Sequence, residues 1–295
     1  MTAITCSKII QLYTQNLCAI GLSNQEAQQE IWWMLEKITQ KKKASLLANN
    51  IHIESKNISE IKNWIHERTI TRKPLAYILG SLPFANIDIL VESPILIPRP
   101  ETEEWVIWLI EQLKSIGTET LSILDLCTGT GCIALTLAKN FPKANVIGVD
   151  INEKAIDLAN KNKIYNNISN ATFLQSNLFD DLKSTDMFDL IVANPPYITM
   201  QEYVTLEPEI KNWEDKNALI AENNGLIFYQ RIARDSQHYL NNHSILNIKE
   251  LPQIICEIGT NFEEVKNIFS NSFFKNTQLY QDMYGTQRWI SIWTF

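Results

Sequence analysis

The chain has 295 residues, of which 45% are hydrophobic and 20% charged, a composition typical of a globular protein of about two domains. Its formal net charge of −7 argues against a protein held on nucleic acid by a broad basic surface. Residues 1–80 nevertheless carry ten Lys and Arg against six Glu, a balance of +4 that leaves −11 for the rest. This basic part either docks an acidic partner or is a helical domain whose lysines are solvated.

The five cysteines and four histidines do not predict a metal site, because no C-x-x-C pair occurs and the histidines do not cluster with the cysteines. Scattered cysteines, odd in number, are typical of a reducing compartment, so we expect a cytoplasmic protein without a metal. No apolar run approaches the length of a membrane span, and the amino terminus lacks the pattern of a secretory or transit peptide. We therefore expect no membrane partner.

Residues 1–70 are expected to be helical throughout, since no strand-like alternation appears before about residue 84. Ser23 and Glu26 have the spacing of a capping box, and the segment that they open has apolar residues at helical spacing. These patterns predict a small all-helical domain over residues 1–80.

A β-hairpin linker is expected over residues 81–101. Phe84–Val91 alternates as a strand does, Ser93-Pro94 turns the chain, and Ile95–Ile97 follows as the return strand. The hairpin would join the helical domain to the rest of the chain.

Two prolines, Pro98 and Pro100, stiffen the next segment on either side of Arg99. Arg99 is a candidate for lining a substrate site, and the alternative is a surface ion pair with Glu103. Thr102 is expected to cap the helix that follows.

Residues 102–295 alternate between apolar strand-like runs and helical segments, which predicts βαβ units and an α/β domain with a parallel sheet. The expected strands are Ser122–Leu126, Val146–Asp150, Thr172–Gln175, Phe188–Ala193, Pro252–Glu257, Thr277–Gln281 and Gln287–Trp293.

The loop after the first of these strands is rich in glycine, and Asp150 ends the second strand. Glycine lets the backbone approach a ligand closely, and a carboxylate at this strand end can accept both ribose hydroxyls. The arrangement indicates an adenosine site. Gly129, Gly131 and Ala134 also satisfy the dinucleotide fingerprint, so a hydride-transferring dehydrogenase is a competing hypothesis.

The tetrapeptide Asn194-Pro195-Pro196-Tyr197 follows a buried strand, where open α/β sheets place their ligands. A planar amide or exocyclic amine is a poor nucleophile, and the Asn194 Oδ1 and the Pro195 carbonyl can accept its N–H hydrogens. Tyr197 can cover its flat face. Alone, the tetrapeptide could also be a Pro-Pro turn that leaves a strand. A nicotinamide enzyme has no need of two acceptors for an NH₂ group, so a methyltransferase is favoured over a dehydrogenase.

The expected methyl donor is S-adenosylmethionine, whose product is S-adenosylhomocysteine. Asp125 and the glycine loop would hold its methionine end, Asp150 its ribose, and the residues after the third strand its adenine. We expect Asn194, Pro195 and Tyr197 to act in catalysis, with no metal, covalent intermediate or assigned general base. The residues predicted to bind the cofactor are Asp125, Cys127, Thr128, Gly129, Thr130, Gly131, Asp150, Asn177, Leu178 and Asn194, and those predicted to bind the substrate are Arg99, Asn194, Pro195, Pro196 and Tyr197.

Over nearly its whole length the chain resembles the PrmC/HemK family of peptide chain release factor N5-glutamine methyltransferases. The resemblance implies a Rossmann-like methyltransferase sheet with one antiparallel strand, joined by a β-hairpin to a small all-helical N-terminal domain. It implies as substrate the Gln side chain of the Gly-Gly-Gln motif in release factors, whose methylation modulates translation termination. The helical domain would dock the release factor. The motifs that carry the resemblance are Pro74–Gly80, Ile97–Glu103, Leu124–Gly131, Asn194–Ile198, Ala218-Leu219 and Glu257–Gly259.

The chain departs from the family pattern at Cys127, where the family usually has Gly, and at Asn177, where Asp is common. Asn177 can still accept a bond from the adenine amine but lacks the charge. The residues after Gly259 lack the family's usual Gln. Three glutamates beyond the tetrapeptide are expected to be solvated loop charges, namely Glu207, Glu209 and Glu214.

Two further classes stay open. An adenine-N6 methyltransferase acting on DNA or RNA would use the same pocket, but the acidic catalytic domain argues against it, and no stable nucleic-acid binding is expected. A non-catalytic binding protein would not need an intact tetrapeptide and glycine loop.

Overall fold

The computed structural model describes residues 4–48, 52–115, 117, 120–241, 243–248, 250–274 and 276–294. The chain forms two compact units. The first unit comprises Met1–Ser81 and Pro208–Trp213, and the second comprises Leu82–Glu207 and Glu214–Phe295. The chain therefore passes between the units three times, and a short segment beyond the Asn-Pro-Pro-Tyr tetrapeptide belongs to the first unit. Within the described ranges, no helix combines the length and the apolar run that crossing a bilayer requires.

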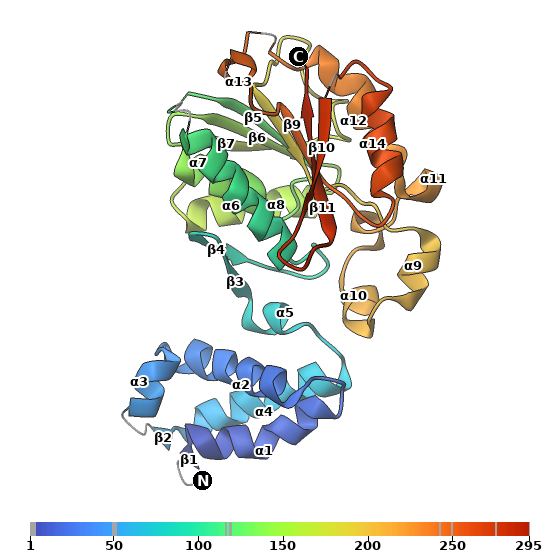
Figure 1. Ribbon diagram of the computed structural model, residues 1–295. Helices are drawn as coiled ribbons and strands as arrows, with labels where there is room; N and C mark the ends of the chain where they lie inside the picture. The colour runs from blue at the N-terminus through green and yellow to red at the C-terminus, as the bar shows by residue number, and fades with distance from the viewer. Residues whose placement is uncertain are drawn as a thin grey trace. The chain divides into compact units, whose positions relative to one another are not determined.

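The first unit is a helical bundle with a two-stranded ribbon (Figure 1). Strands β1 (Ile4–Thr5) and β2 (His52–Ile53) pair antiparallel, so the prediction of helix throughout was wrong at these two short segments. Residues 1–3 and 49–51, also predicted helical, lie outside the described residues. The helices are α1 (Cys6–Cys18), α2 (Asn24–Thr39), α3 (Lys43–Ala48), α4 (Ser55–Ile70), α5 (Leu75–Leu79) and α10 (Pro208–Trp213).

Helix α2 begins as its capping box predicts. Ser23 Oγ accepts a hydrogen bond from the Glu26 backbone N–H at 3.3 Å, and a Glu26 carboxylate oxygen accepts one from the Ser23 N–H at 2.8 Å. The apolar face of α2, including Ile31 and Leu35, is fully buried among residues of the other helices. Helical periodicity therefore predicted the core of this unit correctly.

The acidic residues after the tetrapeptide are not all solvated loop charges. Glu209 on α10 accepts hydrogen bonds from Arg68 Nη1 at 2.8 Å and Arg72 Nη2 at 2.9 Å. Arg68 also donates through Nε to Glu30 at 2.9 Å, and its side chain is 9% exposed. In the second unit, Glu214 is buried and pairs with an arginine. The prediction was wrong for Glu209 and Glu214 because their partners lie more than 100 positions away in the sequence.

A seven-stranded sheet forms the centre of the second unit, in the order β10-β11-β9-β8-β5-β6-β7. β11 runs antiparallel to both of its neighbours, and the other neighbouring pairs are parallel, which confirms the α/β prediction with one antiparallel strand. Every described side chain of β8 is buried, as expected of a central strand covered on both faces. The strands are β5 (Ser122–Leu126), β6 (Asn145–Asp150), β7 (Ala171–Gln175), β8 (Leu190–Ala193), β9 (Ile254–Glu257), β10 (Asn276–Gln281) and β11 (Gln287–Trp293).

Helices cover both faces of this sheet (Figure 1). One face carries α6 (Pro100–Ser115), α7 (Cys132–Asn140) and α8 (Glu153–Tyr165), and the other carries α12 (Ile227–Asp235) and α14 (Phe262–Ser270). The shorter elements of this unit are α9 (Met200–Thr205), α11 (Glu222–Gly225), α13 (Ile245–Ile248) and the 3-10 helices η1 (Lys216–Ala218) and η2 (Ser236–His238).

The hairpin lies earlier in the chain than predicted. It consists of β3 (Ser81–Phe84) and β4 (Ile87–Leu90), and the segment expected as a return strand, Ile95–Ile97, is not a strand. Asn162 on α8 takes the place of a neighbouring strand at the end of β4: its Oδ1 accepts from the Leu90 N–H at 2.6 Å and its Nδ2 donates to the Leu90 carbonyl at 3.0 Å. Sequence alternation alone does not reveal this side-chain partner.

Helix α6 begins at Pro100, three residues before the start that a cap at Thr102 predicts, so Thr102 lies inside its first turn. The Thr102 hydroxyl is consequently not a cap and donates instead to Glu257 Oε2 at 2.6 Å. Proline is favoured at a helix start because its missing N–H would have no partner there.

The loop after β5 requires left-handed backbone at several positions. Gly129 has φ +54° and Gly131 φ +80°, while Cys127 adopts φ +59° with a side chain. This region costs an ordinary residue about 1 kcal/mol or more, and glycine much less. The departure of Cys127 from the family pattern therefore falls at a strained position.

The fully buried Asn162 side chain makes three hydrogen bonds that alanine cannot replace. Two join it to the Leu90 backbone, and the third runs from its Nδ2 to the Thr130 carbonyl at 3.0 Å. We expect Asn162→Ala to lower the free energy of unfolding by about 3 kcal/mol. Asn160→Ala is the matched control on the same helix, because Asn160 is half-buried and, among the described residues, its side chain bonds to the Ile156 carbonyl within α8. Urea unfolding measures both changes, and equal losses would contradict the assignment.

Cys127 offers a second test of stability. At an ordinary site alanine is more stable than glycine, but at φ +59° the order should reverse, because the Cβ itself causes the strain. We expect Cys127→Gly to be more stable than Cys127→Ala by about 1 kcal/mol in urea unfolding. A more stable alanine variant would show that the loop relaxes around the side chain.

Candidate active site

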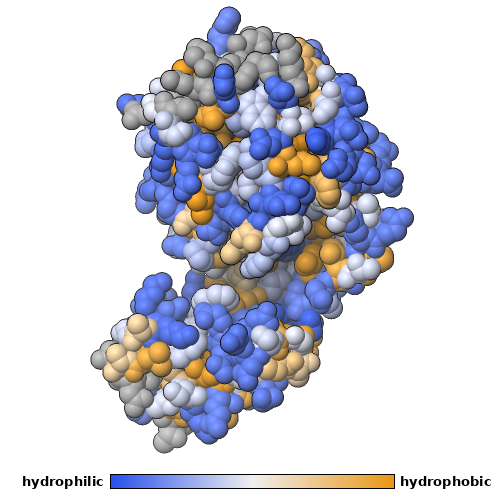
Figure 2. All heavy atoms as spheres, in the orientation of Figure 1, coloured by the Kyte–Doolittle hydropathy of each residue, from blue (hydrophilic) through white to orange (hydrophobic). Residues whose placement is uncertain are grey.

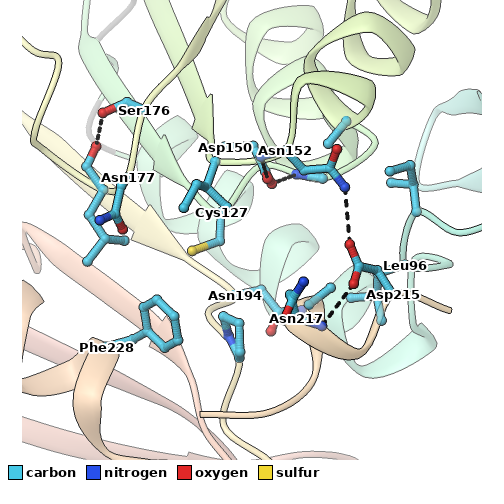
Figure 3. Close-up of a pocket in the computed structure, with 17 residues that line it drawn as sticks. Leu96, Cys127, Asp150, Asn152, Ser176, Asn177, Asn194, Asp215, Asn217 and Phe228 are labelled. Carbon is cyan, nitrogen blue, oxygen red and sulfur yellow. Dashed lines mark hydrogen bonds between the residues drawn. The ribbon is translucent and has the colours of Figure 1, made fainter. Parts of the chain in front are cut away.

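A narrow cavity of about 90 Å³ lies at the carboxyl ends of the central strands, within the second unit (Figure 3). It adjoins a wider hollow of about 730 Å³. Parallel strands that end at one edge of a sheet place their following loops side by side, which explains the position. Six residues line both spaces: Ile151, Asn152, Asn177, Asp215, Asn217 and Phe228.

The structure brings together several of the residues that the sequence predicted for a site. Those that line the narrow cavity are Cys127, Gly129, Asp150, Asn177, Leu178, Asn194 and Pro196. The other predicted residues are not among those that line it, namely Arg99, Asp125, Thr128, Thr130, Gly131, Pro195 and Tyr197. In Figure 3 Cys127, Asn194 and Phe228 converge on the cavity from different elements.

Asp125 lies beneath the glycine loop and is 0% exposed. Its Oδ2 accepts hydrogen bonds from Thr128 Oγ1 at 2.5 Å and from the Ala134 N–H at 3.2 Å, so the carboxylate holds the loop to the start of α7. Burial raises the pKa of Asp125 to about 7. Its Oδ1 is buried and has no hydrogen-bond partner among the described residues. An unpaired buried carboxylate oxygen fits a ligand that brings positive charge or a donor.

Asp150 ends β6 and faces the cavity. Its Oδ2 accepts from the Gly129 N–H and its Oδ1 from the Asn152 N–H, both at 2.9 Å. Burial raises the pKa of this carboxyl group. Each oxygen keeps acceptor capacity beyond its one backbone bond, as two vicinal hydroxyl groups would require.

The sequence reasoning did not find a polar cluster on the opposite wall. Asn152 Nδ2 donates to Asp215 Oδ2 at 3.2 Å, and Asp215 Oδ1 accepts from the Asn217 N–H at 2.9 Å (Figure 3). The Asp215 backbone is held by a 2.7 Å bond to the Pro94 carbonyl. Asp215 and Asn217 lie in an aperiodic segment, so only an Asx-turn pattern marked them locally.

Asn177, at the other end of the cavity, is already engaged. Its Oδ1 accepts from Arg231 Nη1 at 2.7 Å, and its Nδ2 donates to Asp180 at 3.0 Å. The amide oxygen has a second lone pair for a ligand. Phe228 lies near Asn177 and turns its ring toward the cavity (Figure 3). Sequence periodicity assigned Phe228 only to a helix and not to a site.

Asn194 stands at the end of β8, and its Nδ2 donates to Thr102 Oγ1 at 3.2 Å. Tyr197 is turned to the interior, where its hydroxyl donates to Glu257 Oε1 at 3.3 Å. Burial raises the pKa of Tyr197, with a contribution from the charge of Glu257. A Cβ at Gly259 would lie 2.8 Å from the Tyr197 ring, so the glycine makes room for it.

Arg99 pairs with Glu214, whose side chain is 1% exposed, rather than with Glu103. Glu103 instead accepts from the Ala85 N–H at 2.8 Å. Because Glu214 directly precedes Asp215, Arg99 stabilises the segment that forms one wall of the cavity. The alternative of a surface ion pair between Arg99 and Glu103 is therefore wrong, and the prediction that Arg99 contributes to a substrate site stays a prediction.

Two protein families match the chain. The PrmC N-terminal domain family matches residues 9–80, and the methyltransferase small domain family matches residues 107–210. Two solved structures share the fold at low identity. The hMettl16 catalytic domain in complex with MAT2A 3'UTR hairpin 6 is 18% identical with a TM-score of 0.54, covering 84% of this chain and 85% of that one. A T. thermophilus 16S rRNA methyltransferase in complex with AdoMet and guanosine is 17% identical with a TM-score of 0.51, covering 72% and 49%.

Curated relatives are considerably closer in sequence. The release factor glutamine methyltransferase of Thermodesulfovibrio yellowstonii is 40% identical over 247 residues, which are 83% of this chain and 85% of the relative. That of Lactococcus lactis is 34% identical and covers 89% of this chain and 92% of the relative. Their identity extends over both units, and the sheet is that of a Rossmann-like methyltransferase. The chain belongs to the release factor glutamine methyltransferase family.

Proposed function

We propose that the protein transfers the methyl group of S-adenosylmethionine to the side-chain amide nitrogen, N5, of the Gln in the Gly-Gly-Gln motif of peptide chain release factors. The observation that carries the proposal is the amide of Asn194 at the edge of a cavity that begins at the glycine loop and Asp150. The names of the relatives, release factor glutamine methyltransferase, supply the substrate class.

The residues around the cavity fit S-adenosylmethionine. Asp150 has acceptor capacity for the ribose hydroxyls, and the unpaired Asp125 Oδ1 and the glycine loop suit the charged methionine end. Leu178 and Phe228 provide apolar surface for adenine beside the Asn177 amide. When bound, the cofactor supplies a methyl group on a positively charged sulfur.

Asn194 and Pro195 act on the glutamine. An amide nitrogen attacks poorly because its lone pair is delocalised into the carbonyl group. The Asn194 Oδ1 and the Pro195 carbonyl accept its two N–H hydrogens, which raises electron density on nitrogen and holds the lone pair toward the methyl group. No metal, covalent intermediate or general base is assigned; as the N–CH₃ bond forms and the S–CH₃ bond breaks, the nitrogen loses one proton to water. Arg99 contributes by holding Glu214 and the cavity wall.

The helical domain of residues 1–80 is proposed to dock the release factor. Its net charge of +4 suits an acidic surface. Several large apolar side chains are exposed on it, and Figure 2 shows apolar groups among hydrophilic ones on the face in view. The exposed large apolar side chains of this domain include Leu12, Trp33, Leu47 and Ile70.

Methyl transfer from labelled S-adenosylmethionine tests the function directly. We expect label on a purified release factor and none on the same factor with its Gly-Gly-Gln glutamine replaced by alanine. Asn194→Ala should lower kcat by about 10²-fold or more, because the acceptor that aligns the amide is lost, while cofactor affinity stays near wild type.

Asn271→Ala, at an exposed asparagine beyond α14, is the matched control and should retain full turnover. Near-full activity of Asn194→Ala would overturn the mechanism. Label on DNA or RNA instead of the release factor would move the same chemistry to adenine and overturn the substrate assignment.

Gly259 provides a test of the Tyr197 position. In Gly259→Ala the new Cβ would lie 2.8 Å from Tyr197 Cδ2, so the ring must shift and pull on the tetrapeptide backbone. We expect kcat to fall about tenfold, with a stability loss of about 1–3 kcal/mol typical of overpacking. Steady-state kinetics and thermal unfolding measure the two effects, and unchanged kinetics would show that the ring does not position the site.

A further inference from the structure

Two linked hydrogen bonds connect a buried carboxylate to Asn194. Glu257 ends β9 and is 2% exposed. Its Oε2 accepts from Thr102 Oγ1 at 2.6 Å and from Trp105 Nε1 at 3.0 Å. The same Thr102 Oγ1 lies 3.2 Å from the Asn194 amide nitrogen. Helix α6 thus places one hydroxyl group between a strand-end carboxylate and the asparagine of the tetrapeptide.

The direction of these bonds follows from the number of hydrogens. Trp105 Nε1 can only donate, so Glu257 Oε2 is an acceptor. The single hydrogen of the Thr102 hydroxyl then points to Glu257, as the short 2.6 Å distance to a carboxylate requires. Only lone pairs of Thr102 face Asn194. An amide NH₂ group fits there, whereas an amide oxygen would meet another oxygen without a hydrogen between them.

We infer that Glu257 and Thr102 are positioning residues that hold the Asn194 amide in one of its two orientations, with Nδ2 inward and Oδ1 toward the substrate. An asparagine amide is nearly symmetric in shape, and a rotation of about 180° exchanges its oxygen and nitrogen. The rotated form would present a donor to the donor hydrogens of the substrate amide. For its effect on methyl transfer the inference rests on the proposed function, but the orientation itself does not.

The surroundings of Glu257 support this role. Burying a carboxylate is costly unless its oxygens are satisfied, and here Thr102, Trp105 and Tyr197 donate to it. Thr102 is hydrogen-bonded to Asn194, and Tyr197 follows Asn194 three residues later in the same tetrapeptide. The carboxylate therefore organises the tetrapeptide from below and leaves the cavity side of Asn194 free for a ligand.

Exchange of side-chain amide hydrogens tests the orientation without any substrate. In amide NMR spectra of the full chain, the Asn194 NH₂ pair is assigned by its absence from Asn194→Ala. We expect Thr102→Val, which keeps the shape and removes the hydroxyl, to speed exchange of this pair about tenfold, and Thr102→Ser to restore protection. Unchanged exchange in Thr102→Val would overturn the inference even if the protein methylates release factors.

Turnover tests the consequence. Thr102→Val should lower kcat about tenfold with little change in KM, and Thr102→Ser should recover most of it. In the Asn194→Ala background Thr102→Val should cause no further loss, because it acts through that residue. Thr136→Val on α7 is the matched control: Thr136 is equally buried, its Oγ1 has no partner among the described residues, and turnover should stay at the wild-type level.

Additive losses in the double variant, or an equal loss in Thr136→Val, would show that Thr102 is merely structural and overturn the inference. Absence of any methyl transfer by the wild type, together with the expected exchange pattern, would refute the proposed function and leave the orientation of Asn194 established.

Discussion

The parallel arrangement of the central strands is the constraint on which the candidate site depends. β5, β6 and β8 end at the same edge of the sheet, so the glycine loop, Asp150 and Asn194 meet although they come from separate parts of the sequence. The left-handed backbone of the loop is a consequence, since a tight turn from β5 into α7 needs φ values that glycine tolerates best.

Two buried carboxylates support this edge from inside. Asp125 holds the glycine loop, and Glu257 holds the tetrapeptide through Thr102 and Tyr197. Burial raises the pKa of both groups, yet donors satisfy most of their oxygens, the exception being Asp125 Oδ1. Burying a carboxylate raises the free energy of the folded state, and here the two carboxylates in return orient the side chains and backbone that bond to them.

The segment after the tetrapeptide is anchored at two points. Within the first unit, α10 is held by Arg68 and Arg72, which pair with Glu209. Within the second unit, Glu214 is held by Arg99. Ion pairs that are partly shielded from water need close geometry to offset desolvation, and each of these pairs fixes its own part of the segment within its own unit. The one segment therefore contributes to both units.

The sequence by itself determined the order of the main elements, the largely parallel sheet, the apolar faces of the helices and the strand-end residues Asp150 and Asn194, because periodicity and turn chemistry are local. The one antiparallel strand was implied only by the resemblance to the family. It also carried the family motifs. Only the tertiary structure decided the hairpin position, the ion pairs of Glu209 and Glu214, the role of Thr102, and the wall formed by Asp215 and Asn217. Each of these depends on a partner distant along the chain, such as Asn162 for β4 or Glu257 for Thr102, and no local pattern encodes such a distance.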